Sequence, residues 1–310
     1  MTQIITVITH EYILLASDRR VTFISGMNAG SIKDDDRCKL VNLCNTCVIG
    51  YTGLAEVEGT MTHEWLLHKL AAANCQDPYS AARIISEDAT RAFSNSPLAI
   101  RRHLFILAGW AYFEDLDGLR PHFCVISNSL DEYGKWLSQA KESFDYRARA
   151  LRDEEGFLWY ATGARLTQSR QKDLERNIRR LMKHEIGPKS ALRLLSEEIV
   201  HTSRNNRKVG NKVLSACIPK RSVINQIAEG HFRIIAEHPE LNTATFTYFD
   251  PSSKDLRQFG PAFVCGGMAV TDVETESRPD QDYQSSQLRI ISLPKKGNDL
   301  SNSTSDKNPS

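Results

Sequence analysis

The chain has 310 residues, of which 39 are basic and 38 acidic, so its formal net charge is +1. A balanced charge gives no general attraction to nucleic acid or anionic membranes, and a hydrophobic fraction of 41% argues against wholesale disorder. No apolar run approaches the roughly 20 residues that cross a bilayer, and the N-terminus lacks a signal-peptide pattern. We therefore expect a cytoplasmic protein with neither a membrane nor a nucleic-acid partner.

The chain begins with β-branched and apolar runs that predict strands. After Gly53 the apolar residues change to helical spacing, and Asp77-Pro78 is typical of the start of a further helix. The elements predicted up to this point are strands at Ile4–Thr9, Tyr12–Ala16 and within Lys39–Tyr51, followed by helices at Leu54–Leu70 and Tyr79–Phe93.

The same order then repeats once. Strands are predicted at His103–Phe113, Pro121–Asn128, Phe144–Leu151 and Phe157–Thr162, helices at Gln168–His184 and Lys189–His201, and strands at Lys212–Ile218, Phe232–Ala236, Thr243–Phe249 and Ala262–Val264. Helices grouped in pairs between blocks of strands indicate layers rather than alternating βαβ units. The prediction is an α+β protein, a four-layer αββα sandwich with two antiparallel sheets between two helix pairs.

The composition changes near Val273, where Ser, Asp, Asn, Pro and Lys become frequent and aromatic residues rare. We expect one domain over residues 1–272 and a mostly disordered polar tail over residues 273–310. Within that tail, Leu288–Leu293 is the one segment that could add a short strand.

Seven cysteines with irregular spacing favour free thiols in a reducing compartment. Cys44 and Cys47 form a C-x-x-C pair without the second ligand pair of a zinc site, and they lie in an apolar stretch, so buried free cysteines are the better interpretation. The chain also lacks the G-x-S-x-G, P-loop and G-x-G-x-x-G motifs. Neither a metal nor a cofactor is expected.

Four residues near the N-terminus form a pattern that points to chemistry. Removal of Met1 would leave Thr2 with a hydroxyl beside its own free α-amine, which is a self-contained pair of nucleophile and base. Asp18 ends a predicted strand, Lys39 starts the next strand pair, and Gly53 stands where a strand passes into a helix. A lysine held by a carboxylate lowers the pKa of a nearby amine, and N–H groups at a helix start can stabilise an oxyanion.

Asp18 and Lys39 also have ordinary structural interpretations. Asp18 could cap a turn or pair with Arg19 or Arg20, and Lys39 could be an exposed charge at a strand edge. Lys33 is a rival for the role of Lys39, but it precedes three aspartates and is expected to face solvent.

Together these features resemble the proteasome β-subunit superfamily of N-terminal-nucleophile hydrolases, including the HslV peptidase and the Anbu-type proteins. The resemblance rests on Thr2, the run Ala-Ser-Asp-Arg-Arg-Val-Thr that ends at Thr22, Lys39-Leu40, and Gly-Tyr-Thr-Gly at residues 50–53. It covers roughly Thr2 to Gly267, and the block order of the predicted elements agrees with that family's sandwich.

The resemblance implies roles for particular residues. Thr2 would be the nucleophile, Asp18 and Lys39 its supporting ion pair, and the Gly53 N–H the oxyanion donor. Thr162 would stand where the family uses a serine near the nucleophile. Two further positions depart from the family pattern, because Asn206 and Val209 stand where an aspartate and a serine are expected. Loss of that charge would weaken or abolish turnover.

The leading hypothesis is therefore a threonine-type amide hydrolase that cleaves peptide or protein substrates within a homo-oligomeric ring. Because the chain has no ATPase motif, any energy-driven unfolding would need a separate ATPase unfoldase. Two alternatives stay open, namely a catalytically inactive structural subunit and an amidase for small molecules on the same scaffold.

Overall fold

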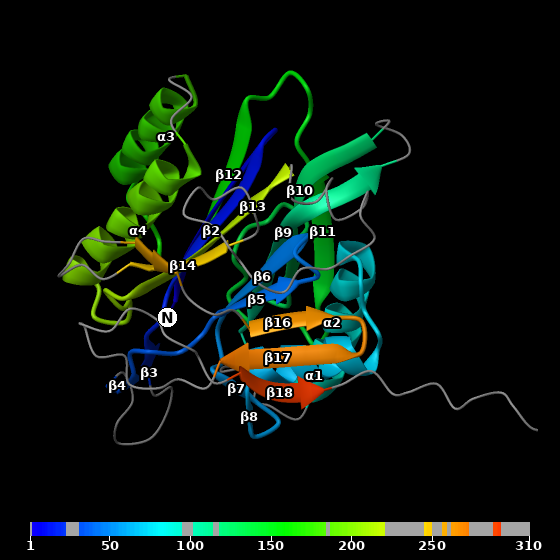
Figure 1. Cartoon of the computed structure of the whole chain (residues 1–310). Helices are drawn as coiled ribbons and strands as arrows, with labels where there is room; N and C mark the ends of the chain where they lie inside the picture. The colour runs from blue at the N-terminus through cyan, green and yellow to red at the C-terminus, as the bar shows by residue number, and fades with distance from the viewer. Residues whose placement is uncertain are drawn as a thin grey trace, which may run out of the picture.

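The computed structural model describes residues 2–22, 31–94, 102–113, 118–183, 187–220, 245–249, 256–258, 262–272 and 288–292. Most of the strands belong to two large sheets, which lie between the helices (Figure 1). The predicted strand Phe232–Ala236 lies outside the described residues.

The first sheet has six strands, all antiparallel to their neighbours. In spatial order they are β12 (Phe157–Gly163), β1 (Gln3–Thr9), β2 (Tyr12–Asp18), β13 (Val213–Pro219), β14 (Thr245–Phe249) and β15 (Leu256–Gln258). The N-terminal strand thus lies inside this sheet, and every residue of β1 is buried.

The second sheet has eight strands. In spatial order they are β11 (Asp145–Ala150), β10 (Gly118–Ser127), β9 (Leu104–Phe113), β6 (Cys47–Thr52), β5 (Leu40–Leu43), β16 (Ala262–Cys265), β17 (Met268–Asp272) and β18 (Leu288–Ser292). The expectation of purely antiparallel sheets is wrong at one place, because β5 and β16 run parallel. The sheet also continues past residue 272, since β18 pairs with β17.

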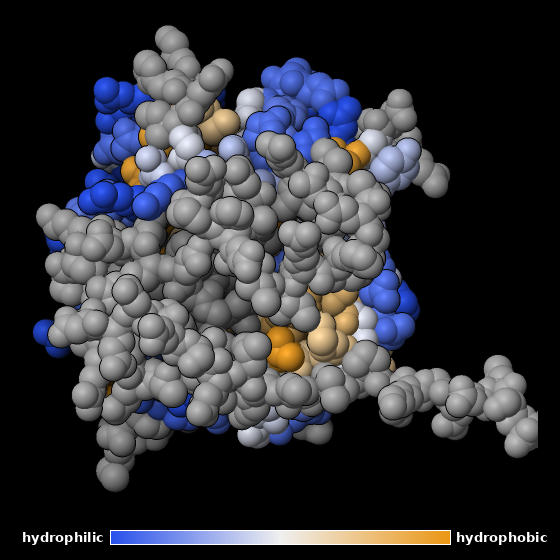
Figure 2. All heavy atoms as spheres, in the orientation of Figure 1, coloured by the Kyte–Doolittle hydropathy of each residue, from blue (hydrophilic) through white to orange (hydrophobic). Residues whose placement is uncertain are grey.

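Four helices cover the sheets among the described residues. Helices α1 (Thr62–Ala72) and α2 (Pro78–Phe93) contact the eight-stranded sheet, and α4 (Pro188–Asn205), paired with α3 (Gln168–Lys183), contacts the six-stranded sheet (Figure 1). Hydrophilic side chains gather over α3 on the surface (Figure 2). No helix in the described part of the chain is long and apolar enough to span a membrane.

The alternation of side chains along β1 explains how one strand serves two cores. Ile4 and Ile8 belong to the apolar cluster shared with the eight-stranded sheet and with α1 and α2. Ile5 and Val7 belong to a second cluster under α3 and α4. The same division holds for β2 and β13, so both faces of these three strands are packed against apolar side chains.

The prediction of a helix directly after Gly53 is wrong. A small hairpin, β7 (Glu56–Val57) and β8 (Thr60–Met61), comes first, and α1 starts only at Thr62. The two turn residues Glu58 and Gly59 have φ angles of 51° and 76°, which a helix cannot accommodate and a two-residue hairpin turn requires. A further small pair is formed by β3 (Val21–Thr22) and β4 (Ile32–Asp34).

The prediction that all seven cysteines are free is also wrong. Cys44 and Cys265, which stand 221 positions apart in sequence, form a disulfide. The parallel pairing of β5 with β16 brings the two strand ends together, and this contact leaves no trace in the local spacing of cysteines. The other five, Cys38, Cys47, Cys75, Cys124 and Cys217, are buried thiols.

Candidate active site

Thr2 lies immediately before β1 and is held against the end of β12. The Ala164 N–H donates to the Thr2 carbonyl oxygen at 2.9 Å. Gly163 has a φ of +84°, and a Cβ added there would lie 1.7 Å from the same carbonyl oxygen. Only glycine therefore allows β12 to approach so closely, and the position of Thr2 depends on it.

Asp18 is a fully buried carboxylate at the end of β2. It accepts three backbone N–H bonds: from Gln3 to Oδ1 at 2.7 Å, and from Arg20 and Gly210 to Oδ2 at 3.1 Å and 3.0 Å. These donors come from β1, from the second residue after β2, and from the segment that follows α4. A buried charge needs such partners, and they hold the carboxylate in one orientation.

Lys39 completes the cluster. Its Nζ lies 3.2 Å from Asp18 Oδ2, donates to Thr2 Oγ1 at 2.9 Å, and also donates to the carbonyl oxygen of Arg20. Burial lowers the pKa of Lys39 below its ordinary value, while the charge of Asp18 opposes that shift. The buried amine of Lys39 thus lies within hydrogen-bond distance of the Thr2 hydroxyl.

The alternative partners of these residues lie elsewhere. Arg20 pairs through its guanidinium with Asp35, at 2.5 Å and 2.9 Å, and gives Asp18 only its backbone N–H. Lys33 forms an ion pair with Glu56 in the hairpin before α1. The structure therefore brings together Thr2, Asp18 and Lys39, and it places Lys33 outside this cluster.

Gly53 and Asn206 lie on the wall of a cavity that adjoins Thr2 through Gly163, although Thr2 itself is not a lining residue. The cavity has a volume of about 570 Å³, and Gly163 belongs to the same wall. Gly53 has a φ of +127°, and a Cβ there would lie 2.6 Å from both the Arg102 carbonyl oxygen and His103 Nδ1. The strand end at Gly53 therefore also excludes a side chain, although the overlap is less severe than at Gly163.

The remaining predicted residues are placed less directly. Thr162 is buried on β12 opposite Ile4, and within the described part of the chain no hydrogen bond joins its hydroxyl to Thr2. Asn206 caps the end of α4, where its Oδ1 accepts the Lys208 N–H at 3.0 Å. The Asn206 side chain therefore holds a turn, and that turn leads to Gly210, whose N–H reaches Asp18.

Sequence reasoning missed the backbone groups that complete this cluster. Gly210 and the Arg20 carbonyl both contribute through the main chain, so residue type carries little information about them. The one available signal is the glycine itself, because a Cβ at Gly210 would lie 2.8 Å from the Cβ of Arg20. Within the described residues, no group of three or more His, Cys, Asp or Glu side chains could hold a metal ion.

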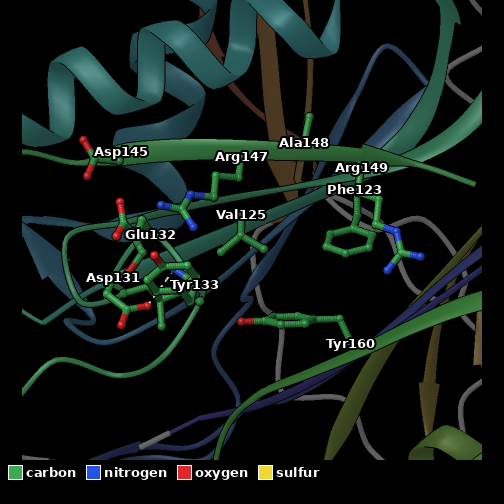
Figure 3. Close-up of a pocket in the computed structure, with 13 residues that line it drawn as sticks. Phe123, Val125, Asp131, Glu132, Tyr133, Asp145, Arg147, Ala148, Arg149 and Tyr160 are labelled. Carbon is green, nitrogen blue, oxygen red and sulfur yellow. Dashed lines mark hydrogen bonds between the residues drawn. The ribbon is translucent and has the colours of Figure 1, made fainter.

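A second cavity, of about 360 Å³, lies between β10 and β11 and the edge strand β12 (Figure 3). The ring of Phe123 stacks on Tyr160 there, with ring centroids 5.8 Å apart. Arg147 and Arg149 share this cavity with three acidic residues, Asp131, Glu132 and Asp145. Its charges are therefore mixed, unlike those of the cavity beside Thr2.

Comparisons with known proteins give structural likeness only. No protein-family model matches the chain, and no curated protein matches it. Solved structures similar to it include a Gly-1 mutant of Anbu from Hyphomicrobium sp. strain MC1, with 16% identity, a TM-score of 0.43, and coverage of 70% of this chain and 80% of the other. Anbu from Yersinia bercovieri, described as an ancestral beta-subunit, has 15% identity, a TM-score of 0.41, and coverage of 70% and 81%.

Both structures are Anbu, a type of protein that the N-terminal motifs also resemble. With identities of 16% and 15% and TM-scores below 0.5, these likenesses assign neither an activity nor a substrate to this chain. The chemistry of the site therefore has to be argued from its own contacts.

Proposed function

We propose that the chain is a threonine-type N-terminal-nucleophile amide hydrolase that acts on peptides, with Thr2 as its nucleophile after removal of Met1. The observation that carries the proposal is the contact of 2.9 Å from Lys39 Nζ to Thr2 Oγ1, made by a lysine that is itself held by the buried Asp18. Burying a charged pair costs free energy unless further partners compensate for the lost water. A lysine with only a structural role would not need to be buried in this way.

The reaction would follow from the groups that surround Thr2. The hydroxyl oxygen attacks the amide carbon while its proton passes to the free α-amine, and the charge of Lys39 stabilises the developing alkoxide. The oxyanion faces the Gly53 N–H. The C–N bond then breaks, the leaving amine takes the proton, and an ester on Thr2 remains. Water hydrolyses this ester with the α-amine as base.

The wider proposal includes the scaffold and the assembly. The two helix pairs and the two sheets would form the αββα sandwich of this hydrolase class, built as a domain over residues 1–272 with a polar tail. The chain would work in the cytoplasm as a homo-oligomeric ring, and it would need a separate ATPase to unfold protein substrates.

One observation favours a second candidate, a catalytically inactive structural subunit. Asn206 stands where the resemblance calls for an aspartate, and its side-chain oxygen is engaged by Lys208 in a turn. In this candidate the cluster around Asp18 would serve only to hold β1, β2 and the segment after α4 together.

Labelling of the nucleophile separates the two candidates. Intact mass should show loss of Met1, and an uncharged β-lactone should add once to the protein, at Thr2. A Thr2→Ala variant should not be labelled, and Lys33→Met should be labelled like the unchanged protein. Retention of Met1, or no labelling of the protein that has lost it, would favour the structural subunit.

A further inference from the structure

The cavity beside Thr2 is positioned to receive part of a substrate. Gly163 lines the cavity, and the next residue, Ala164, donates its N–H to the carbonyl oxygen of Thr2. Gly53, on the same wall, marks the proposed oxyanion position. A group bound in this cavity of about 570 Å³ would therefore lie next to the scissile amide.

Two arginines line this cavity, and its described wall carries no negative charge. Arg102 enters from the segment before β9, and Arg165 enters from the segment after β12. Both are solvent-exposed, and no described residue that lines the cavity is acidic. His103 adds no charge of its own, because burial lowers its pKa to about 3.

The second cavity provides an internal comparison. There Arg147 lies toward the end of the cavity that holds Asp131 and Glu132, whereas Arg149 lies at the other end, beside Phe123 (Figure 3). Arg149 is also bonded to Glu155. Acidic residues thus accompany the arginines of the second cavity, whereas no described acidic residue lines the cavity beside Thr2.

We propose that Arg102 and Arg165 bind a carboxylate of the substrate, so that the site prefers acidic peptides. This inference rests on the proposed function. A guanidinium presents paired donors that fit a carboxylate, and such charge-assisted bonds are stronger than neutral ones. Trp136, which also lines the cavity, offers an apolar face beside the two charges for the methylenes of a glutamate side chain.

Internally quenched peptides test this preference directly. Each of six positions around the cleaved bond carries either Glu or Gln in matched pairs, which differ in charge and hardly in size. At one position we expect Glu to raise kcat/KM by about tenfold at low salt, with a smaller gain at high salt. The double variant Arg102→Gln/Arg165→Gln should lose this preference, while Arg83→Gln, an exposed arginine of α2, should keep it.

Two further measurements keep failure of the inference separate from failure of the proposed function. Thr2→Ala cannot turn over substrate, so calorimetric binding of the preferred Glu peptide and its Gln partner to this variant reports recognition alone, with about tenfold tighter binding of Glu expected. An uncharged β-lactone reports the nucleophile alone. If the β-lactone labels Thr2 but neither cleavage nor binding prefers the Glu peptides, the inference about the two arginines is wrong and the proposed hydrolase activity still stands. Selective binding of the Glu peptide without β-lactone labelling of Thr2 would contradict the proposed hydrolase activity and support the carboxylate-binding site.

Discussion

Lys39 and Lys33 stand six positions apart, and each forms an ion pair, but the two pairs lie in opposite surroundings. The Lys39 and Asp18 side chains are 3% and 0% exposed, whereas those of Lys33 and Glu56 are 39% and 45% exposed. The buried pair is joined to Thr2 and to three backbone N–H groups, while the exposed pair joins two surface strands. An ion pair alone therefore does not identify the candidate site. The pair of Lys39 and Asp18 is distinguished by its burial and by its additional hydrogen bonds.

The largest expected effect comes from breaking the buried pair. Lys39→Met keeps most of the side-chain volume and leaves the Asp18 charge buried without its cation. We expect a loss of about 3–5 kcal/mol in the free energy of unfolding. Urea denaturation measures this loss. A loss below about 1 kcal/mol would show that the three backbone N–H bonds alone satisfy Asp18.

The next largest effect concerns the close approach at Thr2. Gly163→Ala would combine a strained positive φ with an overlap at the Thr2 carbonyl, and we expect a loss of about 3 kcal/mol. Gly134 is a matched control, because its φ is +76° but nothing lies within 4 Å of an added Cβ. Gly134→Ala should cost only about 1 kcal/mol in the same denaturation experiment. Equal losses would mean that the approach at Thr2 can relax.

Two buried histidines make the free energy of unfolding depend on pH. Burial lowers the pKa of His103 to about 3 and that of His122 to about 4, so the unfolded chain binds more protons between these values and pH 6.5. Stability is therefore fully present above pH 6.5 and falls as the pH decreases, with a slope that rises to at most about 1.4 kcal/mol per pH unit for each histidine.

A variant of one buried histidine isolates its share. His122→Phe should reduce the slope of unfolding free energy against pH between 6.5 and 5 by about 1 kcal/mol per unit, whatever its effect on stability at pH 7. An unchanged slope in His122→Phe would mean that this ring is already accessible to protons in the folded state.

The smallest effect is expected at the exposed pair. Lys33→Met should change the free energy of unfolding by less than about 0.5 kcal/mol, because solvent screens the charges of Lys33 and Glu56. It should also leave β-lactone labelling of Thr2 unchanged. A loss comparable to that of Lys39→Met would remove the distinction on which the candidate site rests.

Much of the secondary structure was predictable because apolar periodicity reports which face of an element is buried. The helices α2, α3 and α4 and the strands β1 and β2 lie close to their predicted bounds. The exception after Gly53 arises from two consecutive residues with positive φ, Glu58 and Gly59, of which only the glycine carries a signal. The Cys44–Cys265 disulfide escaped prediction because it depends on a parallel strand pairing across 221 positions.

The candidate site also has one part that the residue types predict and another part that they do not. Side-chain chemistry at Thr2, Asp18 and Lys39 can be read in the residues themselves, because a hydroxyl, a carboxylate and an amine each have few uses at a strand end. Their convergence within 3.2 Å, the N–H groups of Gln3, Arg20 and Gly210, and the two arginines of the adjoining cavity follow only from packing of the two sheets. Local residue types encode which groups are available, whereas contacts between distant segments decide which groups meet, because those contacts depend on how the whole core is filled.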